Sequence, residues 1–413
     1  MTTDSSRNKI QYLYVFIVFC MTFSAVKYWR IIGITSINIA MGLALPVAIC
    51  SSFFNSRQFR YLFLYSTIVL LNYLTGDDYF HNKNNLLNGF IGLYVSLSMS
   101  YYIFINKDYK LLKWIVISVF VVLLWTTIAT AYFDISLPGI VRKAFNETLN
   151  KIGDVSLFNS AYALGLSSYT LPHAIPLLIP PFVLGVKNSL LPKSKRIFSG
   201  IMLLCCMLLT YYSGATGPML VAVMVLIMSL LVHKGSVSSN IIKIFLIVLV
   251  FAPFIFDDQI MLSGLEWIDG LLGNEGYFHN KVLDFQDSII YSEASGDIEA
   301  RQGLYSSSIS VILENPLNIL IGAQEGYGGH SVILDRMASL GLVGFVPFIC
   351  MLVIQIKFVR KHISSQFNIY FYLGIFAAFM MLISKNVSGW GMWFFLFAAM
   401  PFLIIYYSVE DVK

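Results

Sequence analysis

Two residues late in the chain have types and a spacing that could do chemistry, and the first is an arginine. Residues 257–336 contain thirteen acidic side chains and three basic ones, and Arg301 is one of the three. Its planar guanidinium offers a fork of donors that suits a phosphate group. The alternative is an ordinary ion pair with Asp297 or Glu299.

The second residue is His330, which follows a glycine-rich stretch and precedes a helical pattern with Ser331 as its N-cap. The partial positive charge at a helix N-terminus disfavours imidazolium, so the ring stays neutral, as a general base requires. The glycines are Gly322, Gly326, Gly328 and Gly329. For the other histidines we expect structural or solvated roles: His81, His173, His233, His279 and His362.

The element that must position Arg301 is a short helix. The residues from Arg301 onward form a partly apolar helical pattern, and Pro316 is expected to end it. Such a helix is too short to span a bilayer. We therefore expect it to lie at the membrane interface, with Arg301 near the level of the lipid headgroups.

The composition sets the environment of these residues. Of the 413 residues, 57% are hydrophobic and 12% are charged, whereas soluble domains are roughly 25% charged. This excludes an ordinary globular enzyme and predicts an integral membrane protein. Lys and Arg fall in short clusters between apolar runs, which is typical of topology signals and does not indicate nucleic acid as a partner.

Apolar segments of about 20 residues predict an all-α polytopic protein with about twelve transmembrane helices. The expected ranges are 10–28 (an uncleaved span), 31–54, 61–76, 86–105, 111–133, 171–186, 197–214, 218–233, 241–256, 337–356, 369–384 and 392–409. Basic residues of the short loops lie mainly on the side of the N-terminus, so both termini are expected in the cytoplasm. The long segments 134–170 and 257–336 then lie outside.

These segments divide the chain into three expected parts. An N-terminal bundle of about nine spans occupies 1–256, and a C-terminal bundle of about three spans occupies 337–413. The large extracytoplasmic loop 257–336, between the ninth and tenth spans, carries the candidate site.

No pattern for a metal or another cofactor accompanies these residues. The five cysteines lie inside apolar segments without the C-x-x-C spacing of a metal or redox site. Neither the G-x-x-x-x-G-K-[ST] loop nor the H-E-x-x-H motif occurs. We expect the protein to work without a cofactor.

The candidate residues form part of a longer motif. It consists of Arg301, the Pro-Leu-x-x-x-x-Gly segment 316–322, His330-Ser331, nine further residues, and Gly341-Leu342-Val343-Gly344. In the principal outer loop of a chain with about twelve spans, this pattern resembles the C-terminal signature of O-antigen polymerases and O-antigen ligases.

The resemblance implies a metal-independent glycosyltransferase at the outer face of the cell inner membrane. The donor would be an undecaprenyl-diphosphate-linked oligosaccharide, His330 would act on the acceptor hydroxyl, and Arg301 would bind the diphosphate leaving group. Glycosyl transfer from a diphosphate donor requires the same groups: a base that accepts the hydroxyl proton and a cation that stabilises the departing diphosphate. Membrane lipid and a chain-length regulator protein are further partners that the resemblance implies.

The chain departs from the family in one place. Many members, the ligases especially, carry a second Arg in a Ser/Thr-x-Arg context where residues 213–217 here read Ser-Gly-Ala-Thr-Gly. A second contact to the diphosphate must come from Arg336, Arg142 or Lys143, or be absent. Arg142 and Lys143 could equally be solvated or bound to lipid headgroups, and Arg336 could simply pair with Asp335 or another nearby acid.

Three functions remain open. A polymerase would add a lipid-linked repeat to a growing lipid-linked glycan, whereas a ligase would transfer the finished glycan to lipid A-core. The polymerase is favoured because the Arg near 215 is missing and the interval from Arg301 to His330 is too short for the larger loop of ligases. A transporter or flippase of the lipid-linked sugar is the alternative from another class, although internal repeats and mid-membrane charges, typical of transporters, are not evident.

Aromatic residues of the outer loop are candidates for sugar stacking. Tyr305 and Tyr327 flank the motif, and Tyr277, Phe278 and Tyr291 lie earlier in the same segment. All five could equally pack the loop itself.

Overall fold

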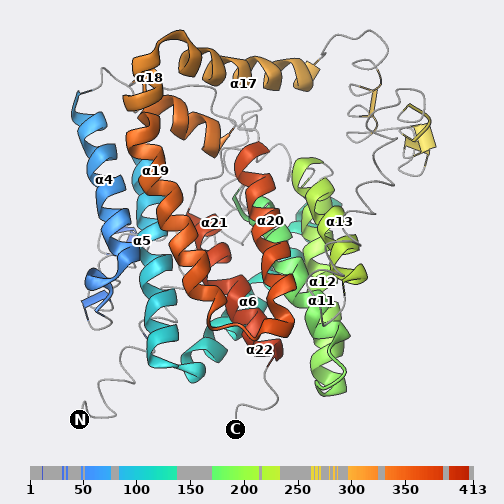
Figure 1. Ribbon diagram of the computed structural model, residues 1–413. Coiled ribbons are helices and arrows are strands. Elements are labelled where there is room, and N and C mark those ends of the chain that lie inside the picture. The colour runs from blue at the N-terminus through green and yellow to red at the C-terminus, as the bar shows by residue number, and fades with distance from the viewer. Residues whose placement is uncertain are drawn as a thin grey trace.

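The computed structural model describes residues 52–75, 83–136, 170–213, 216–232, 296–323, 331–384 and 390–408, with a few positions near the N-terminus and between 262 and 286. Almost all of these residues are helical (Figure 1). The earlier elements are η1 (Phe53–Asn55), α4 (Arg57–Thr75), α5 (Lys83–Asn106), α6 (Tyr109–Ser136), α10 (Thr170–Ala174), η2 (Ile175–Leu178), α11 (Ile179–Lys187), α12 (Lys193–Tyr212) and α13 (Thr216–Leu231). The later ones are α17 (Gly296–Glu314), α18 (Pro316–Ile321), α19 (Val332–Arg360), η3 (Ser365–Phe367), α20 (Asn368–Ser384), α21 (Trp390–Phe394), the π turn η4 (Phe395–Ala399) and α22 (Met400–Ser408).

The chain is a helical membrane protein. Five helical stretches in the described residues are long and apolar enough to cross a bilayer: Tyr109–Phe133, Lys193–Tyr212, Val332–Arg360, Ser365–Ser384 and Gly391–Ser408. Two shorter apolar helices are Leu171–Lys187 and Gly217–Leu231. With α4 and α5, these coincide with nine of the twelve expected ranges. The ranges 10–28, 31–54 and 241–256 lie wholly or largely outside the described residues, so a count of twelve stays a prediction.

The start of the expected span 31–54 differs from the prediction. Strands β1 (Arg30–Ile31) and β2 (Ile34–Thr35) form a two-residue antiparallel pair, with Arg30 opposite Thr35. β-Branched residues on both sides of Gly33 favour a short hairpin over a helix. Any spanning helix in this range begins after Thr35.

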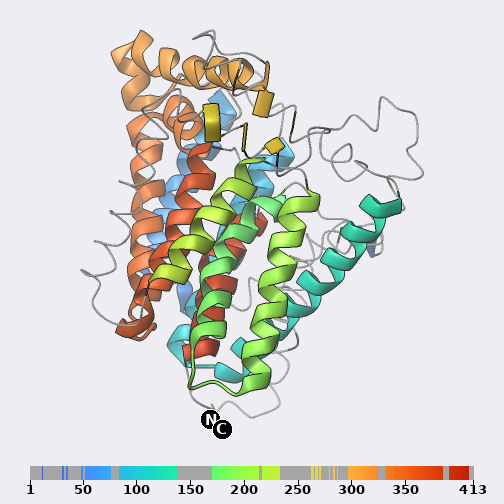
Figure 2. The same cartoon turned by 90° about the vertical axis from the view of Figure 1, so that its right-hand side faces the viewer.

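Helices that are distant in the sequence are neighbours in the bundle. α4 lies along α19, and α5 lies against α21. α11 packs between α12 and α13, and Figure 2 shows these three side by side. One end of the bundle carries the short connections from α5 to α6, α11 to α12 and α19 to α20, while α17 crosses the opposite end (Figure 1).

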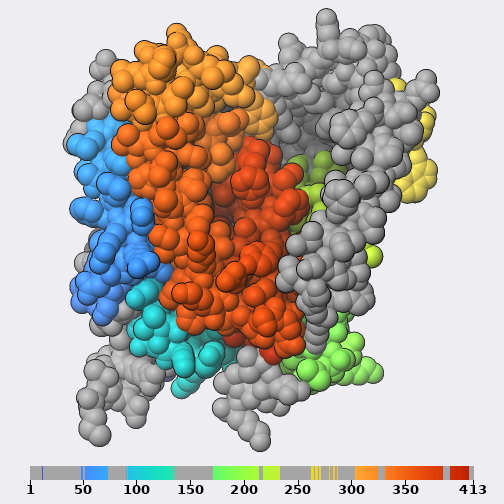
Figure 3. Space-filling view, viewed as in Figure 1, coloured from blue at the N-terminus to red at the C-terminus, as the bar shows by residue number. Residues whose placement is uncertain are grey.

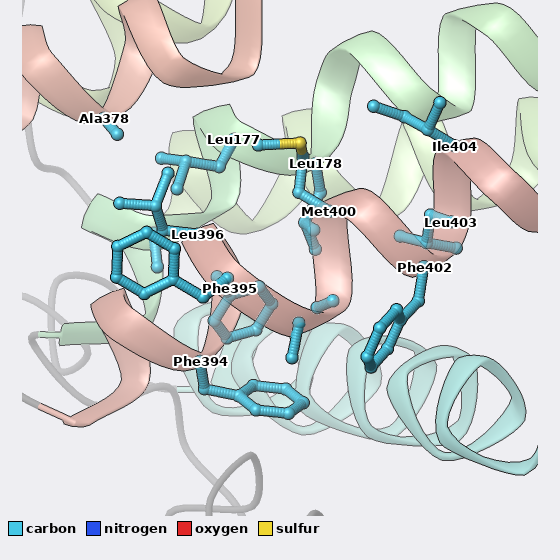
Figure 4. Close-up of a cluster of buried hydrophobic side chains, with 14 of the residues drawn as sticks. Leu177, Leu178, Ala378, Phe394, Phe395, Leu396, Met400, Phe402, Leu403 and Ile404 are labelled. Atoms are coloured by element: carbon cyan, nitrogen blue, oxygen red, sulfur yellow. The ribbon is translucent and has the colours of Figure 1, made fainter. Parts of the chain in front are cut away.

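The centre of the bundle is the segment α21–η4–α22. In the apolar stretch Gly391–Ser408, 89% of the residues are buried, whereas the corresponding share for α12 is 33%. This segment is therefore the core helix around which the others pack. Phe394, Phe395 and Phe402 are fully enclosed. Figure 4 shows Met400 of α22 close to Leu177 and Leu178 of η2, a turn whose four residues are all buried.

Basic side chains gather at the end of the bundle opposite α17, which we call the basic end. Its members are Arg57, Arg60, Lys107, Lys110, Lys113, Lys187, Lys193, Lys195, Arg196, Lys357, Arg360 and Lys361. Two of them cap helix C-termini: Lys187 Nζ donates to the carbonyls of Leu230 (2.7 Å) and Val232 (2.6 Å), and Arg196 Nε donates to that of Val186 (3.0 Å). A cation there complements the helix dipole.

Candidate functional site

The helix predicted after Arg301 is present as α17, and it ends before Pro316 as expected, whereas its place at the membrane interface stays a prediction. α17 stops at Glu314, and Asn315 caps the next helix by accepting a hydrogen bond from the Leu317 N–H (2.9 Å). Pro316 is the first residue of α18, where its missing N–H costs nothing. Figure 1 shows α17 lying across the end of the bundle, and in Figure 3 α17 and α18 cover the start of α19.

Two glycines of the motif interlock at this cover. Gly322 follows α18 with φ 77° and ψ 164°, and Gly341 lies within α19 with φ 58° and ψ −168°. Both backbone conformations are essentially restricted to glycine. A Cβ on Gly322 would overlap the Ser339 carbonyl, and one on Gly341 would overlap the backbone from Leu320 to Gly322. The end of α18 is therefore seated directly on the backbone of α19.

Gly341 divides α19 into two helices. The carbonyls just before the break lose their usual helical partners, and the surrounding structure replaces them. The Ala323 N–H donates to the Ala338 carbonyl (3.0 Å), and the buried side chain of Asn72 on α4 donates to the Ser339 carbonyl (3.0 Å). Buried backbone acceptors need such partners, so the break is built into the packing of α4, α18 and α19.

The predicted cap of α19 is confirmed. Ser331 Oγ accepts a hydrogen bond from the Leu334 N–H (3.2 Å), and the side chain of Asp335 returns the interaction by accepting from the Ser331 N–H (3.2 Å). This reciprocal arrangement resembles a capping box. α19 thus begins at Val332, five residues before the expected start of the C-terminal bundle.

Most of the predicted site residues lie outside what the structure describes. These are His330, Arg142, Lys143 and Tyr327. The backbone of Arg301 lies in the second turn of α17. The side chain of Arg301 lies outside the described residues, and the next described contacts of α17 to the bundle come from Tyr305 and Ser308.

Tyr305 joins α17 to the bundle. Its hydroxyl donates to the carbonyl of Ser384 at the end of α20 (3.0 Å). The ring of Tyr305 is also half-buried. The hydrogen bond and the burial both favour a packing role for Tyr305 over sugar stacking.

Arg336 lies on the first part of α19, half-buried. Its guanidinium carbon is 5.9 Å from the centre of the Tyr65 ring on α4, a cation–π contact. Among the described residues no ion pair joins it to a carboxylate, so the pair with Asp335 considered from the sequence is not formed. The carboxylate of Asp335 instead accepts from Ser308 Oγ (2.9 Å) and from Ser331 N.

The sequence did not lead us to expect a role in this region for two residues, Ser308 and Asn72. Asn72 is the one amide side chain in the mainly apolar range 61–76 and is 6% exposed, and that contrast is a signal that sequence reading can use. Ser308 is fully buried, but it lies in a run of three serines, and nothing in the sequence distinguishes it from its neighbours.

His279 has the kind of contact expected of a structural residue. Its Nδ1 lies 2.8 Å from the Asp269 carboxylate.

Within the described residues no group of three or more His, Cys, Asp or Glu side chains could hold a metal ion. No protein-family model matches the sequence, and no curated protein does.

Proposed function

We propose that the protein is a glycosyltransferase of the O-antigen polymerase type in the cell inner membrane. It would extend a lipid-linked glycan with repeats delivered on undecaprenyl diphosphate. His330 is the general base, and Arg301 binds the diphosphate, with Arg336 as a further cation.

The observation that carries this proposal is the interlock of Gly322 and Gly341. These residues belong to separate parts of the motif on which the resemblance rests, and the close backbone contact gives a physical reason why both are glycines. The helix that carries Arg301 leads into this interlock, since α17 is followed directly by α18, and Ser331, the residue after His330, is the N-cap of α19. The described parts of the motif therefore pack together at the end of the bundle.

The charge distribution supports the proposed orientation. Basic residues mark the cytoplasmic side of membrane proteins, and they gather at the basic end, away from α17. Residues 304–321 of α17 and α18 contain a single charge, Glu314, and expose Leu313, Leu317 and Leu320. A segment of this kind suits the outer interface, the level at which a lipid-linked diphosphate presents its sugar.

The proposed step uses these groups in a balanced way. The acceptor hydroxyl oxygen forms a bond to the anomeric carbon of the donor sugar, and its proton passes to His330. The bond between that carbon and the diphosphate oxygen breaks, and undecaprenyl diphosphate leaves with the electron pair. Arg301 and Arg336 stabilise the negative charge on the leaving group.

The surface glycan of a deletion strain tests the proposal. The strain is complemented with the wild type, His330→Ala or Arg301→Ala, and the controls are His362→Ala and Arg57→Ala at the basic end, with membrane levels measured for each. We expect core capped by a single repeat in the deletion strain and in both site variants, and normal ladders in both controls. Full-length polymer on undecaprenyl diphosphate beside bare core would indicate a ligase.

One observation favours a second candidate, a transporter of the lipid-linked sugar. Transporters use discontinuous helices as binding sites, and α19 is discontinuous at Gly341. However, the carbonyls before this break are bonded to Ala323 and Asn72, so protein groups fill it. Lipid-linked repeats that stay on the cytoplasmic face of the deletion strain would identify a transporter.

A further inference from the structure

The carboxylate of Asp335 joins two segments that are distant in sequence. Its Oδ1 accepts from Ser308 Oγ on α17 (2.9 Å), and its Oδ2 accepts from the Ser331 N–H at the start of α19 (3.2 Å). Ser308 and Ser331 are both fully buried. Water therefore does not compete for these donors, and one carboxylate fixes α17 relative to the first turn of α19.

The two donors lie close in sequence to the two residues of the proposed reaction. The N–H of Ser331 belongs to the peptide bond that follows His330. Ser308 is seven residues, about two turns, after Arg301 on α17. Asp335 thus ties the backbone next to the proposed base to the helix that carries the proposed diphosphate ligand.

We propose that Asp335 is a positioning residue that holds α17, the helix carrying Arg301, against the start of α19, which follows His330 in the sequence, an inference that rests on the function proposed above. Asp335 acts through the backbone of these segments and does not touch the substrate. Hydrogen bonds to a carboxylate are stronger than those between neutral groups, and a negative charge is favourable in the first turn of a helix. Both features suit a fixed link.

The simpler role for Asp335 is to stabilise the start of α19 alone. That role needs only the Ser331 N–H and the helix dipole, whereas the positioning role also needs Ser308. Ser308→Ala therefore separates the two. Ser310→Ala is its matched control, because Ser310 is an exposed serine on the same helix whose hydroxyl bonds only to the Ser307 carbonyl (3.0 Å).

Hydrogen exchange of the α17 amides tests the link without any assay of activity. The wild type, Ser308→Ala, Asp335→Ala, the double variant and Ser310→Ala are compared in lipid nanodiscs by mass spectrometry. We expect about tenfold faster exchange across 304–314 in Ser308→Ala and Asp335→Ala. The double variant should exchange no faster than Asp335→Ala, because the bond to Ser308 is already lost there.

Kinetics with an undecaprenyl-diphosphate-linked repeat test the consequence for the reaction. Misplacement of reacting groups lowers kcat more than it raises KM. We expect kcat to fall about tenfold or more in Ser308→Ala, with little change in KM, and to stay at the wild-type value in Ser310→Ala.

The outcomes separate this inference from the proposed function. The positioning role is overturned if Ser308→Ala exchanges at the same rate as Ser310→Ala, or if it exchanges faster but keeps the wild-type kcat. The proposed function still stands in both cases, provided that His330→Ala is inactive. Wild-type activity of both Arg301→Ala and His330→Ala would remove the proposed function and the positioning role with it.

Discussion

Replacing Gly341 by alanine should separate α18 from α19 and destabilise the protein. The new Cβ has two effects. It occupies a backbone conformation that only glycine adopts readily, and it overlaps backbone atoms between Leu320 and Gly322, which cannot rotate away as a flexible side chain would.

The expected size of the effect follows from these two contributions. A non-glycine residue in such a backbone conformation costs about 1–3 kcal/mol. Overpacking against a rigid neighbour adds about 1–3 kcal/mol. We therefore expect Gly341→Ala to lower the free energy of unfolding by about 2–6 kcal/mol, and Gly322→Ala to behave similarly because its Cβ would overlap the Ser339 carbonyl.

Gly303 of α17 provides the matched control. It is exposed, and a Cβ there has no neighbour within 4 Å. Alanine in that helix should raise stability by about 0.5–1 kcal/mol. The assay is thermal unfolding of the purified protein in detergent, followed by the loss of the monodisperse chromatographic peak. The reasoning is refuted if Gly341→Ala unfolds at the wild-type temperature or above it, together with Gly303→Ala.

Two further expectations concern the basic end. Lys187→Met removes a charged cap from α13 and should lower the free energy of unfolding by about 1–2 kcal/mol. Lys193 is exposed, so Lys193→Met should leave the stability unchanged. Equal unfolding temperatures for the two variants would contradict the capping role. Burial against Phe104 and Phe358, with further contributions from the nearby lysines, lowers the pKa of His362 below its ordinary 6.5. The neutral ring is then favoured in the fold, so the stability that His362 contributes is present above pH 6.5 and falls as the unfolded chain takes up its proton below it. An NMR titration of the ring should give a midpoint under 6.5, and a midpoint at or above 6.5 would contradict this.

Much of the helical architecture could be predicted from the sequence, because span length and hydropathy are properties of local segments. The helix after Arg301, its end before Pro316 and the cap at Ser331 were predictable for the same reason, since capping residues act within a few positions. α19 begins at Val332, five residues before the expected span 337–356, because Asp335 and Arg336 interrupt the apolar pattern at its start.

The remainder depends on contacts between distant segments. Nothing local shows that Gly341 breaks α19, because that break exists only where the end of α18 meets it. Asp335 follows Ser331 by four positions, but its second partner, Ser308, lies 27 positions away. Side chains of this kind become visible only once the helices are placed.

The central claim is that His330 catalyses glycosyl transfer, and reconstitution tests it most directly. Purified wild type and His330→Ala are placed in liposomes with an undecaprenyl-diphosphate-linked repeat, and the lipid-linked products are separated by size. The account predicts a ladder of oligomers for the wild type and a rate about 10²- to 10⁴-fold lower for the variant, the usual contribution of a general base. Elongation by an intact His330→Ala protein at the wild-type rate would contradict it.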